Sequence, residues 1–577
     1  MSILGIDLGT TNSLGALYID GHIQLIPNAL GSYLTPSVVN IDEAGEVSVG
    51  EVAREKLITD PDNTVSSFKK NMGTNMKYTI RGREFTPQEL SSFVLRSIIN
   101  DAERYVADKE GVTIDEVVIS VPAYFHDKQR VATQEAGALA GAKVHRIVNE
   151  PSAAALAVYS ERKEQELILV FDFGGGTLDV SIVDCFANVV EIISVAGNNK
   201  LGGDDFNALI ADYFLKKNNL TRKDITDAEY ATLLKYSEIA KKQLTSDGQS
   251  TVSLYHNGEN LTAEITNDIL MEESSWIFDR IKEVLEKALK EAELTINEIG
   301  SVILAGGSSN MPIIQTFIKI LFKNTPIFSG GGDEFIAKGV GFVAGIIERD
   351  EELKEMVMTD LCPFSLGVAV HNKGNASRPY MSTIIPRNNA LPCSISDIFT
   401  TLRPDQKKID LEILQGENMY ADENEKLGQM EIKVPENTGH TQNVQVRFAY
   451  DINGVLVVDV TILSTGEKFS TVISQTMDQT ELEKRVEYLN NLQLSEADED
   501  KVITARLDSV YKSSDKQTQE QIRRMLVQYD MVKSSQESRS ISRFRRMMLK
   551  SLDTFEKKNK AFDVFKLYEE YDNDDEE

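Results

Sequence analysis

The chain has 577 residues, of which 41% are hydrophobic and 26% charged, so it is long enough for three or four folded domains. Its formal net charge of −29 argues against binding to nucleic acid or to anionic membrane surfaces, because both attract basic faces. The three cysteines and six histidines are scattered, which argues against a disulfide scaffold or a transition-metal site. With no basic leader and no apolar stretch of about 20 residues, we expect a cytoplasmic protein.

The first predicted element is an apolar strand, residues 3–6, that ends in a carboxylate and a polar turn. Asp7 closes the strand, and a second apolar strand follows at residues 14–19. A charge at the end of a buried strand is costly unless it has a partner or a ligand. The turn between the strands is rich in glycine, hydroxyl and amide groups and comprises Gly9, Thr10, Thr11 and Asn12.

A second copy of this pattern lies in residues 167–179, where an apolar run ends in Asp172 and a turn leads to Thr177 and Asp179. Three glycines in the turn, Gly174, Gly175 and Gly176, would let backbone N–H groups close on a phosphate. Carboxylates suit Mg²⁺, which binds oxygen ligands and phosphate together. An ordinary tight turn is the alternative for either copy alone. Two copies predict two lobes that close on one nucleotide, and a P-loop is excluded because no Gly-Lys dipeptide occurs.

A third glycine cluster follows a buried strand at residues 301–305. Gly306 and Gly307 lead into Ser308 and then a helix from about residue 311. Such a turn allows close backbone approach to a nucleoside, although strand–glycine–helix turns are common in α/β proteins. One helix start is also well marked, because Thr86-Pro87-Gln88-Glu89 combines an N-cap, a proline and a capping-box glutamate.

The pattern changes twice in the second half of the chain. From about residue 361 apolar residues alternate with polar ones, as in 409–413, 444–448 and 456–460, with a hairpin turn at Asn453-Gly454. Residues 351–360 are interpreted as a linker, and a helix end running into a loop is the alternative. After residue 478 helical faces follow, at Leu482, Val486 and Leu489 and again within 503–510 and 522–529.

Six segments together resemble the DnaK family of seventy-kilodalton heat-shock chaperones: residues 5–13, 121–125, 148–155, 172–179, 201–206 and 414–417. The likeness runs from residue 3 to about 475. The short helical part without a glycine-rich tail is most similar to the specialised bacterial HscC-type branch. The resemblance implies a multidomain α/β, all-β and all-α protein. It would comprise an actin-like, two-lobed nucleotide-binding ATPase domain with ribonuclease-H-like sheets (1–350), a linker (351–360), a β-sandwich substrate-binding domain (361–477), a helical lid (478–571) and an acidic tail (572–577).

The resemblance implies hydrolysis of ATP to ADP with Mg²⁺, and it allows K⁺ as a further cation. Asp7 and Asp172 match Mg²⁺-organising carboxylates, with Asp179 as a third metal-site residue. Thr10 and Thr177 would direct hydroxyls at the phosphates, and Glu150 would orient the attacking water. Lys69 would lie near the γ-phosphate. Without the family, Lys69 is one surface lysine among many and Glu150 a cap of the following helix.

The resemblance also implies a nucleoside clamp with one departure from the family pattern. Asn310 stands where the family usually has an arginine stacked on adenine, and loss of that cation would cost on the order of 1 kcal/mol. We therefore expect weaker nucleotide binding than is typical. The matched positions are Gly202, Gly203, Glu238, Lys241, Lys242, Thr245, Gly306, Gly307, Ser308 and Asp333.

A second binding function is implied for the β region, which would hold one apolar side chain of an extended peptide. The matched residues are Val368, Phe399, Leu402, Ile409, Leu411 and Val444, and sandwich core is their alternative use. His371 replaces a methionine opposite Leu402, so peptide specificity would differ. ATP would capture the linker and open the lid through coupling residues matched as Pro122, Arg130, Arg146 and Asp360.

The implied function is an ATP-dependent chaperone active in the stress response, binding unfolded polypeptide clients with a J-domain co-chaperone and a nucleotide exchange factor. A small-molecule kinase on the same fold is the main alternative, and a filament-forming binding module is another. Neither needs a β-sandwich and a helical region after residue 360, so those regions favour the chaperone.

Overall fold

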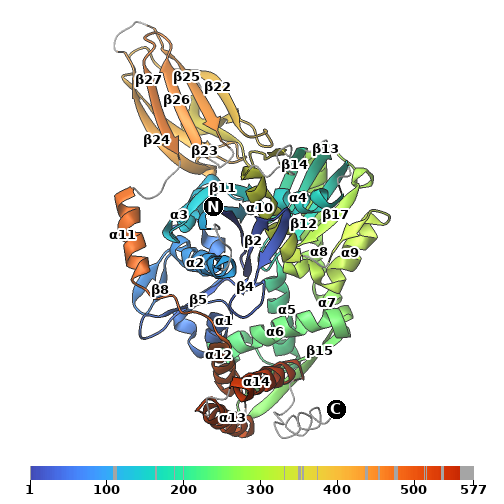
Figure 1. Ribbon diagram of the computed structural model, residues 1–577. Coiled ribbons are helices and arrows are strands. Elements are labelled where there is room, and N and C mark those ends of the chain that lie inside the picture. Colours follow the sequence, from blue (N-terminus) through green and yellow to red (C-terminus); the bar gives the residue numbers. More distant parts are fainter. Residues whose placement is uncertain are drawn as a thin grey trace.

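Figure 1 shows the computed structural model, which describes residues 2–107, 113–162, 165–186, 189–198, 200–329, 332–348, 353, 357–372, 375–435, 440–451, 455–473, 479–512, 514, 516–534 and 538–558. Several predicted features lie outside these residues: the hairpin turn at 453–454, most of the linker before residue 357, the end of the helical region after 558 and the acidic tail 572–577.

The first lobe, residues 2–162, is built on a mixed sheet with strand order β11-β10-β1-β2-β3, in which β4 also pairs with β2. Strands β1 and β2 are antiparallel with Asp7 opposite Leu14, which confirms the predicted hairpin. The strands are β1 (Ser2–Leu8), β2 (Asn12–Ile19), β3 (His22–Ile26), β4 (Thr35–Pro36), β10 (Ile114–Val121) and β11 (Lys143–Asn149).

Helices and two small sheets complete this lobe. Helix α2 begins at Pro87 with the predicted capping box, since the Thr86 side chain accepts from the Glu89 backbone and the Glu89 carboxylate accepts from the Thr86 backbone. The helices are α1 (Glu51–Thr59), α2 (Pro87–Val106), α3 (Asp127–Leu139) and α4 (Glu150–Arg162). The small sheets consist of β5 (Val38–Ile41), β6 (Val47–Val49) and β7 (Thr64–Ser66), and of β8 (Tyr78–Ile80) and β9 (Arg83–Phe85).

The second lobe, residues 165–348, repeats this plan with the strand order β18-β17-β12-β13-β14-β19, in which the edge strand β19 (Val357–Thr359) comes from the segment after the lobe. Strands β12 and β13 are antiparallel with Asp172 opposite Asp179, so the second predicted hairpin is also confirmed. Its strands are β12 (Glu166–Phe173), β13 (Leu178–Phe186), β14 (Val189–Asn198), β15 (Gln249–His256), β16 (Glu259–Thr266), β17 (Ser301–Ala305) and β18 (Ile327–Phe328). Its helices are α5 (Gly203–Lys217), α6 (Asp227–Asp247), α7 (Asn267–Glu273), α8 (Ser275–Glu291), α9 (Pro312–Phe322) and α10 (Gly332–Ile347).

Helices α4 and α10 join the two lobes. They pack against each other, while α10 also contacts β1 and β2 and α4 contacts β13 and β14. A single apolar core links residues of both lobes, including Val118, Ala153, Val170 and Val340. Close approach is possible because a Cβ on Gly339 would lie 1.8 Å from the Ala153 carbonyl oxygen. The lobes are therefore fixed together at this core and can enclose a cleft beside it.

The third part is a β-sandwich of two four-stranded sheets, ordered β21-β20-β23-β24 and β22-β25-β26-β27. Leu366, Ile413, Phe448 and Val458 are fully buried between them, as the alternating pattern predicts. The strands are β20 (Leu366–Asn372), β21 (Asn375–Ile385), β22 (Cys393–Thr400), β23 (Lys408–Gln415), β24 (Glu425–Lys433), β25 (Asn443–Tyr450), β26 (Leu456–Ile462) and β27 (Lys468–Ile473).

The described helices that follow the sandwich pack on the two lobes and not on the sandwich. They are α11 (Gln479–Asn490), α12 (Glu499–Lys512), α13 (Lys516–Ser534) and α14 (Ser538–Lys558). Leu482, Val486 and Leu489 of α11 pack into the core of the first lobe, and α12 packs on α1. Figure 1 shows α12, α13 and α14 at the end of the lobes opposite the sandwich. A separate core joins those three helices, formed by Ile503, Leu507, Val510, Ile522, Met525, Tyr529, Phe544, Met547, Met548 and Leu552.

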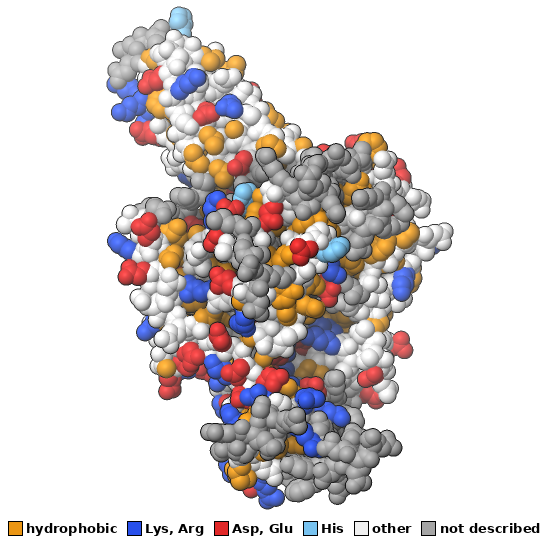
Figure 2. Space-filling view, in the orientation of Figure 1, with side chains coloured by type: hydrophobic (Ala, Val, Ile, Leu, Met, Phe, Trp, Pro, Cys, Tyr) orange, Lys and Arg blue, Asp and Glu red, His pale blue; other side chains and the backbone are white. Residues whose placement is uncertain are grey.

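Surface charge and hydropathy agree with the composition. On the face in Figure 2, acidic and basic side chains are interspersed around hydrophobic ones that gather below the sandwich. Among the helices that the structure describes, none is long and apolar enough to cross a bilayer.

Candidate nucleotide-binding cleft and its coupling elements

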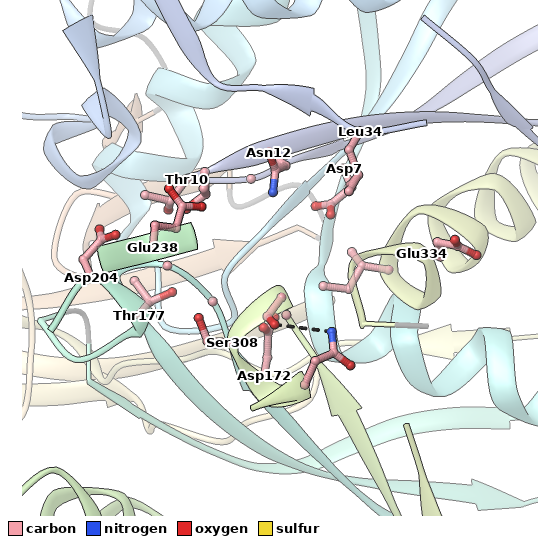
Figure 3. Close-up of a pocket in the computed structure, with 18 of the residues that line it drawn as sticks. Asp7, Thr10, Asn12, Leu34, Asp172, Thr177, Asp204, Glu238, Ser308 and Glu334 are labelled. Atoms are coloured by element: carbon pink, nitrogen blue, oxygen red, sulfur yellow. Dashed lines mark hydrogen bonds between the residues drawn. The ribbon is translucent and has the colours of Figure 1, made fainter. Parts of the chain in front are cut away.

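A cavity of about 710 Å³ lies where the two lobes face each other. Both hairpin turns and the third glycine cluster line it, and Figure 3 shows Asp7 and Asn12 across from Asp172, Thr177 and Ser308. The predicted residues that line it are Asp7, Gly9, Thr10, Thr11, Asn12, Lys69, Pro122, Glu150, Asp172, Gly174, Gly175, Thr177, Glu238, Lys241, Lys242, Thr245, Gly306, Gly307 and Ser308.

The first turn is held by hydroxyl groups that leave its outer face open. The Gly9 N–H donates to Ser13 Oγ at 3.1 Å, and the Ser37 hydroxyl donates to the Gly9 carbonyl at 2.8 Å. Asp7 is nearly buried at the end of β1, where it accepts from the Ser120 hydroxyl at 2.6 Å. The Ser120 hydroxyl, a neutral donor, thereby holds the Asp7 carboxylate in place at the cavity.

The second turn connects directly to the start of helix α5. The Gly203 N–H donates to the Gly174 carbonyl at 2.9 Å, and the Asp204 N–H donates to the Gly175 carbonyl at 2.7 Å. The two turns approach closely, because a Cβ on Gly175 would lie 2.0 Å from Thr11 Oγ1 of the other lobe. Only glycine fits there, and the absence of a side chain leaves backbone groups accessible to a phosphate.

A buried ion pair lies at the base of the cavity. Lys69 Nζ contacts Glu150 Oε1 at 2.8 Å, and both side chains are more than nine-tenths buried. Lys69 also lies 5.5 Å from the Phe125 ring centroid. Burial, together with repulsion from Glu150, raises the pKa of the nearby Asp179 to about 8, although Lys69 acts in the opposite direction. Lys69 is thus the cation that balances a group of buried carboxylates.

Helix α6 supplies charged groups on the far side of the cavity. Burial lowers the pKa of Lys241 to about 8 against the attraction of Glu238, and its ammonium donates to the Gly203 carbonyl at 2.9 Å. Burial alone would raise the pKa of Glu238, but Lys242, which contacts it at 2.6 Å, and Lys241 lower it to about 2. The carboxylate is therefore ionised over the whole physiological range and can accept hydrogen bonds from a ligand.

Gly306 begins the third turn with a φ of +75°. A Cβ there would meet Asp172 Oδ1 and the Phe173 carbonyl carbon, both at 2.6 Å, so the position needs glycine for conformation and for space. Asn310, at the end of this turn, lines the cavity and donates to the Gly307 carbonyl at 3.3 Å.

Some predicted residues lie beside the cavity rather than on its wall. Gly176 belongs to the second turn but does not line the cavity, Gly202 and Gly203 pack against that turn, and Asp179 is buried after it on β13. The side chain of Asp333 lies outside the described residues. The sequence reading missed several lining residues: Gly31, Ser32, Tyr33, Leu34, Asp204, Asn207, Met311, Glu334 and Ile336. Asp204 and Asn207 follow Gly203 on a helix, and that spacing was the available signal for them.

The six residues predicted for peptide binding are divided by their burial. Val368, Leu411 and Val444 are buried in the sandwich core, and Phe399 and Ile409 are half-buried against it. Leu402 is 43% exposed. Three of the six residues therefore serve as sandwich core in this conformation, which was the alternative to peptide binding.

The segment before the sandwich is a strand of the second lobe. Strand β19 (Val357–Thr359) pairs in parallel with β14, and Asp360 accepts from the Ser152 hydroxyl at 2.6 Å on helix α4. Helix α4 begins with Glu150, so a continuous chain of contacts runs from the ion pair to the linker. Arg130 is buried nearby and donates to Asn149 Oδ1, the residue before Glu150. Arg146 lies half-buried on the adjacent strand β11.

The sandwich docks on the first lobe through a buried polar cluster. Gln415 Nε2 donates to Asp127 Oδ1 at 2.9 Å, and the Tyr450 hydroxyl donates to the same oxygen. Phe364 stacks on His126 with ring centroids 4.0 Å apart. Burial raises the pKa of Asp127 and lowers that of His126.

The carboxylates of the cleft could hold Mg²⁺ only with help from other oxygens. Among the described residues, no three carboxylate, histidine or cysteine side chains are grouped closely enough to hold a metal ion by themselves. Asp7 and Asp172 nevertheless present hard oxygen donors to a cavity lined by phosphate-type turns, which fits an ion that keeps several waters and binds phosphate.

Comparison with known proteins agrees with this architecture. The model of the Hsp70 protein family matches residues 3–571. The chain is 38% identical over 503 residues to the chaperone protein DnaK of Thermotoga petrophila, covering 84% of this chain and 83% of that protein. It is 39% identical over 489 residues to the DnaK of Thermotoga neapolitana, covering 82% and 80%. Taken with the two-lobed α/β ATPase fold, the β-sandwich and the helical region, these matches show that the chain belongs to the Hsp70 family.

Proposed function

We propose that the chain is an ATP-driven chaperone in which nucleotide in the cleft controls capture of an extended polypeptide by the sandwich. Membership of the Hsp70 family makes it an ATP-dependent chaperone of unfolded polypeptides. The observation that carries the coupled mechanism is the unbroken path from Lys69–Glu150 through helix α4 and Asp360 to the docked sandwich.

In the cleft, the turns bind the phosphates of the nucleotide, and the Lys69–Glu150 ion pair positions the attacking water. Backbone N–H groups of the two turns, with the hydroxyls of Thr10 and Thr177, hold the phosphates between the lobes. Glu150 orients the attacking water, and Lys69 holds that carboxylate in place while it offsets charge that develops on the phosphate oxygens. Bound Mg²⁺ would be organised by Asp7 and Asp172 and would neutralise charge on the phosphates, with Asp179 and K⁺ as further elements of the cation site.

Glu238, Lys241, Lys242 and Thr245 on one side, and Gly306 to Ser308 with Asp333 on the other, would clamp the nucleoside. Their positions on both walls of one cavity support this role for all but Asp333.

The arrangement of the other parts corresponds to the open stage of the cycle. The linker strand is captured by β14, the sandwich is docked, and the helices pack on the lobes. Hydrolysis would release these contacts and let the helices close over a peptide held by Phe399, Leu402 and Ile409, with Val368, Leu411 and Val444 shaping the pocket from beneath. Pro122, Arg130, Arg146 and Asp360 would transmit the change.

The branch of the family and the partner proteins are inferred from the resemblance to the family. The short helical part favours the HscC-type branch, with a J-domain co-chaperone and a nucleotide exchange factor as partners. Asp360 accepts from Ser152 of helix α4, and α4 directly follows β11, the strand that carries Arg146, which supports a role for this region in coupling.

Phosphate release with and without an unfolded peptide tests the proposal. Wild type should hydrolyse ATP slowly and faster with peptide, and Thr177→Ala should bind ATP but hydrolyse it poorly. Turnover that responds to a small-molecule phosphate acceptor and not to peptide would favour a kinase instead.

A further inference from the structure

Helix α12 has two buried faces that pack on different parts of the molecule. One face lies in the core of the helical bundle α12–α14 and consists of Ile503, Leu507 and Val510. On the other face, Val502 and Ala505 pack against Val52 of helix α1 in the first lobe. The Lys512 ammonium donates to the Thr59 carbonyl at the end of α1, at 2.9 Å. The bundle core needs only one apolar face of α12, so the second face is a surface that holds the bundle on the lobe.

The same bundle also contacts the second lobe. Lys235 of helix α6 contacts Glu55 of helix α1 at 2.8 Å, and its ammonium also donates to the Ser509 hydroxyl of α12 at 3.5 Å. Glu55 and Ser509 are buried although both are polar. Helix α14 contacts α6 as well, and Figure 1 shows α12 beside both α1 and α6. The bundle therefore lies across the junction of the two lobes.

Helices α1 and α6 lie next to opposite walls of the nucleotide cavity. Helix α6 contributes Glu238 and Lys241 to the wall of the second lobe. In the first lobe, Gly31 and the three residues after it line the cavity, and the preceding Leu30 packs against the cluster of Val52 and Val502. Separation of the lobes at this junction would pull α1 away from α6 and break the contact between Glu55 and Lys235. A bundle that holds both helices must leave one of them before this can happen.

We propose that the helical bundle is a clamp that joins α1 to α6 and slows release of the nucleotide as long as it is docked. Bound nucleotide would be retained until the bundle leaves the lobes, and release would be faster afterwards. By reciprocity, a closed cleft favours docking of the bundle. This inference rests on the proposed nucleotide-binding function and adds a control on the lifetime of the complex.

The test measures how fast a fluorescent ATP analogue leaves the full chain when excess unlabelled ATP is added in a stopped-flow instrument. All proteins carry Thr177→Ala, so that ATP is not consumed. Ala505→Glu puts a charge into the buried contact with α1, and release should become about five- to tenfold faster. Thr504→Glu makes the same charge change at the adjacent, exposed position and should leave the rate within about twofold of the parent.

A second pair of variants separates the clamp from the stability of the bundle. Val502→Ala and Val510→Ala remove the same two methyl groups, from the lobe-facing side and from the bundle core of α12. Val502→Ala should speed release about two- to threefold, whereas Val510→Ala should lower the melting temperature of the bundle and leave the release rate nearly unchanged.

Two outcomes would overturn the clamp while nucleotide binding stood. One is a release rate in Ala505→Glu and Val502→Ala equal to that of the parent, and the other is equal acceleration by Val502→Ala and Val510→Ala. Failure of the parent protein to bind the ATP analogue would overturn the nucleotide proposal as well.

Discussion

The nucleotide cleft and the β-sandwich differ in how much their buried residues disclose about function. In the cleft, carboxylates, a lysine and an asparagine are buried at strand ends and helix starts, where charge or polarity needs a partner. In the sandwich, the residues matched to peptide binding are apolar, and Val368, Leu411 and Val444 are as buried as the core around them. A buried charge therefore points to a ligand, whereas a buried valine is satisfied by packing alone.

The largest effect is expected from a substitution that removes the buried positive charge of the cleft. Lys69→Met should reduce ATP turnover about 10²–10³-fold, because a preorganised charge next to the reacting phosphate is lost and Glu150 is left buried without its partner. Steady-state phosphate release measures this. Lys77→Met is the matched control, since Lys77 and its partner Glu84 are both exposed. Turnover within threefold of wild type in Lys69→Met would remove Lys69 from the mechanism.

A smaller but still large effect is expected from closing the gap between the two turns. Gly175→Ala places a methyl group 2.0 Å from Thr11 Oγ1, so Thr11 or the lobes must shift and ADP affinity should fall at least about tenfold. Calorimetric titration of ADP checks this. Gly258→Ala, at a positive φ with open space around it, should lower stability slightly and leave ADP affinity unchanged. Equal affinities in the two variants would contradict the close approach of the turns.

In the sandwich, two substitutions distinguish residues of the core from residues of the peptide pocket. Val368→Ala should lower unfolding stability by about 1–3 kcal/mol, since the side chain is fully buried, whereas Phe399→Ala should lower peptide affinity several-fold with less effect on stability. Thermal unfolding and peptide titration on both variants make the comparison. The reverse pattern would mean that Val368 faces the peptide and Phe399 the core.

Docking of the sandwich should depend on pH. Burial raises the pKa of Asp127 in the docked state above its ordinary value near 4, so its contribution favours docking at low pH and is lost as pH rises through the docked pKa. His126, whose pKa is lowered, acts in the opposite direction below about pH 6.5. Energy transfer between dyes on the sandwich and the first lobe reports docking. The difference between wild type and Asp127→Asn isolates the carboxylate, and docking of wild type that strengthens relative to this variant as pH rises would contradict it.

The smallest expected effect concerns binding of the adenine ring. Asn310→Arg supplies a planar cation at the rim of the cavity and should raise ADP affinity about fivefold, for a gain on the order of 1 kcal/mol. Competition with a fluorescent ADP analogue is sensitive enough to detect it. Unchanged or weaker affinity would show that Asn310 does not limit nucleotide binding.

The sequence predicts the cleft better than it predicts how the parts dock. Both hairpins and the α2 capping box were predictable, because Asp7, Asp172 and Glu89 have local physical reasons to be where they are. The periodicity of Leu482, Val486 and Leu489 showed a buried face, but periodicity does not say which surface covers it, and here that surface is the first lobe. Asn207 was missed although it follows Gly203 on the same helix, because its unfilled oxygen is visible only in the folded chain.

The central claim is that nucleotide in the cleft controls the sandwich. Fluorescence anisotropy of a labelled extended peptide rich in Leu and Arg, titrated with the full chain in ATP and in ADP, tests it most directly, with Thr177→Ala to hold the ATP state. We predict tight binding in ADP and weaker, faster-exchanging binding in ATP, because the lobes hold the linker strand and the helices in the open arrangement. Equal peptide affinity in ATP and ADP would contradict the coupling between cleft and sandwich.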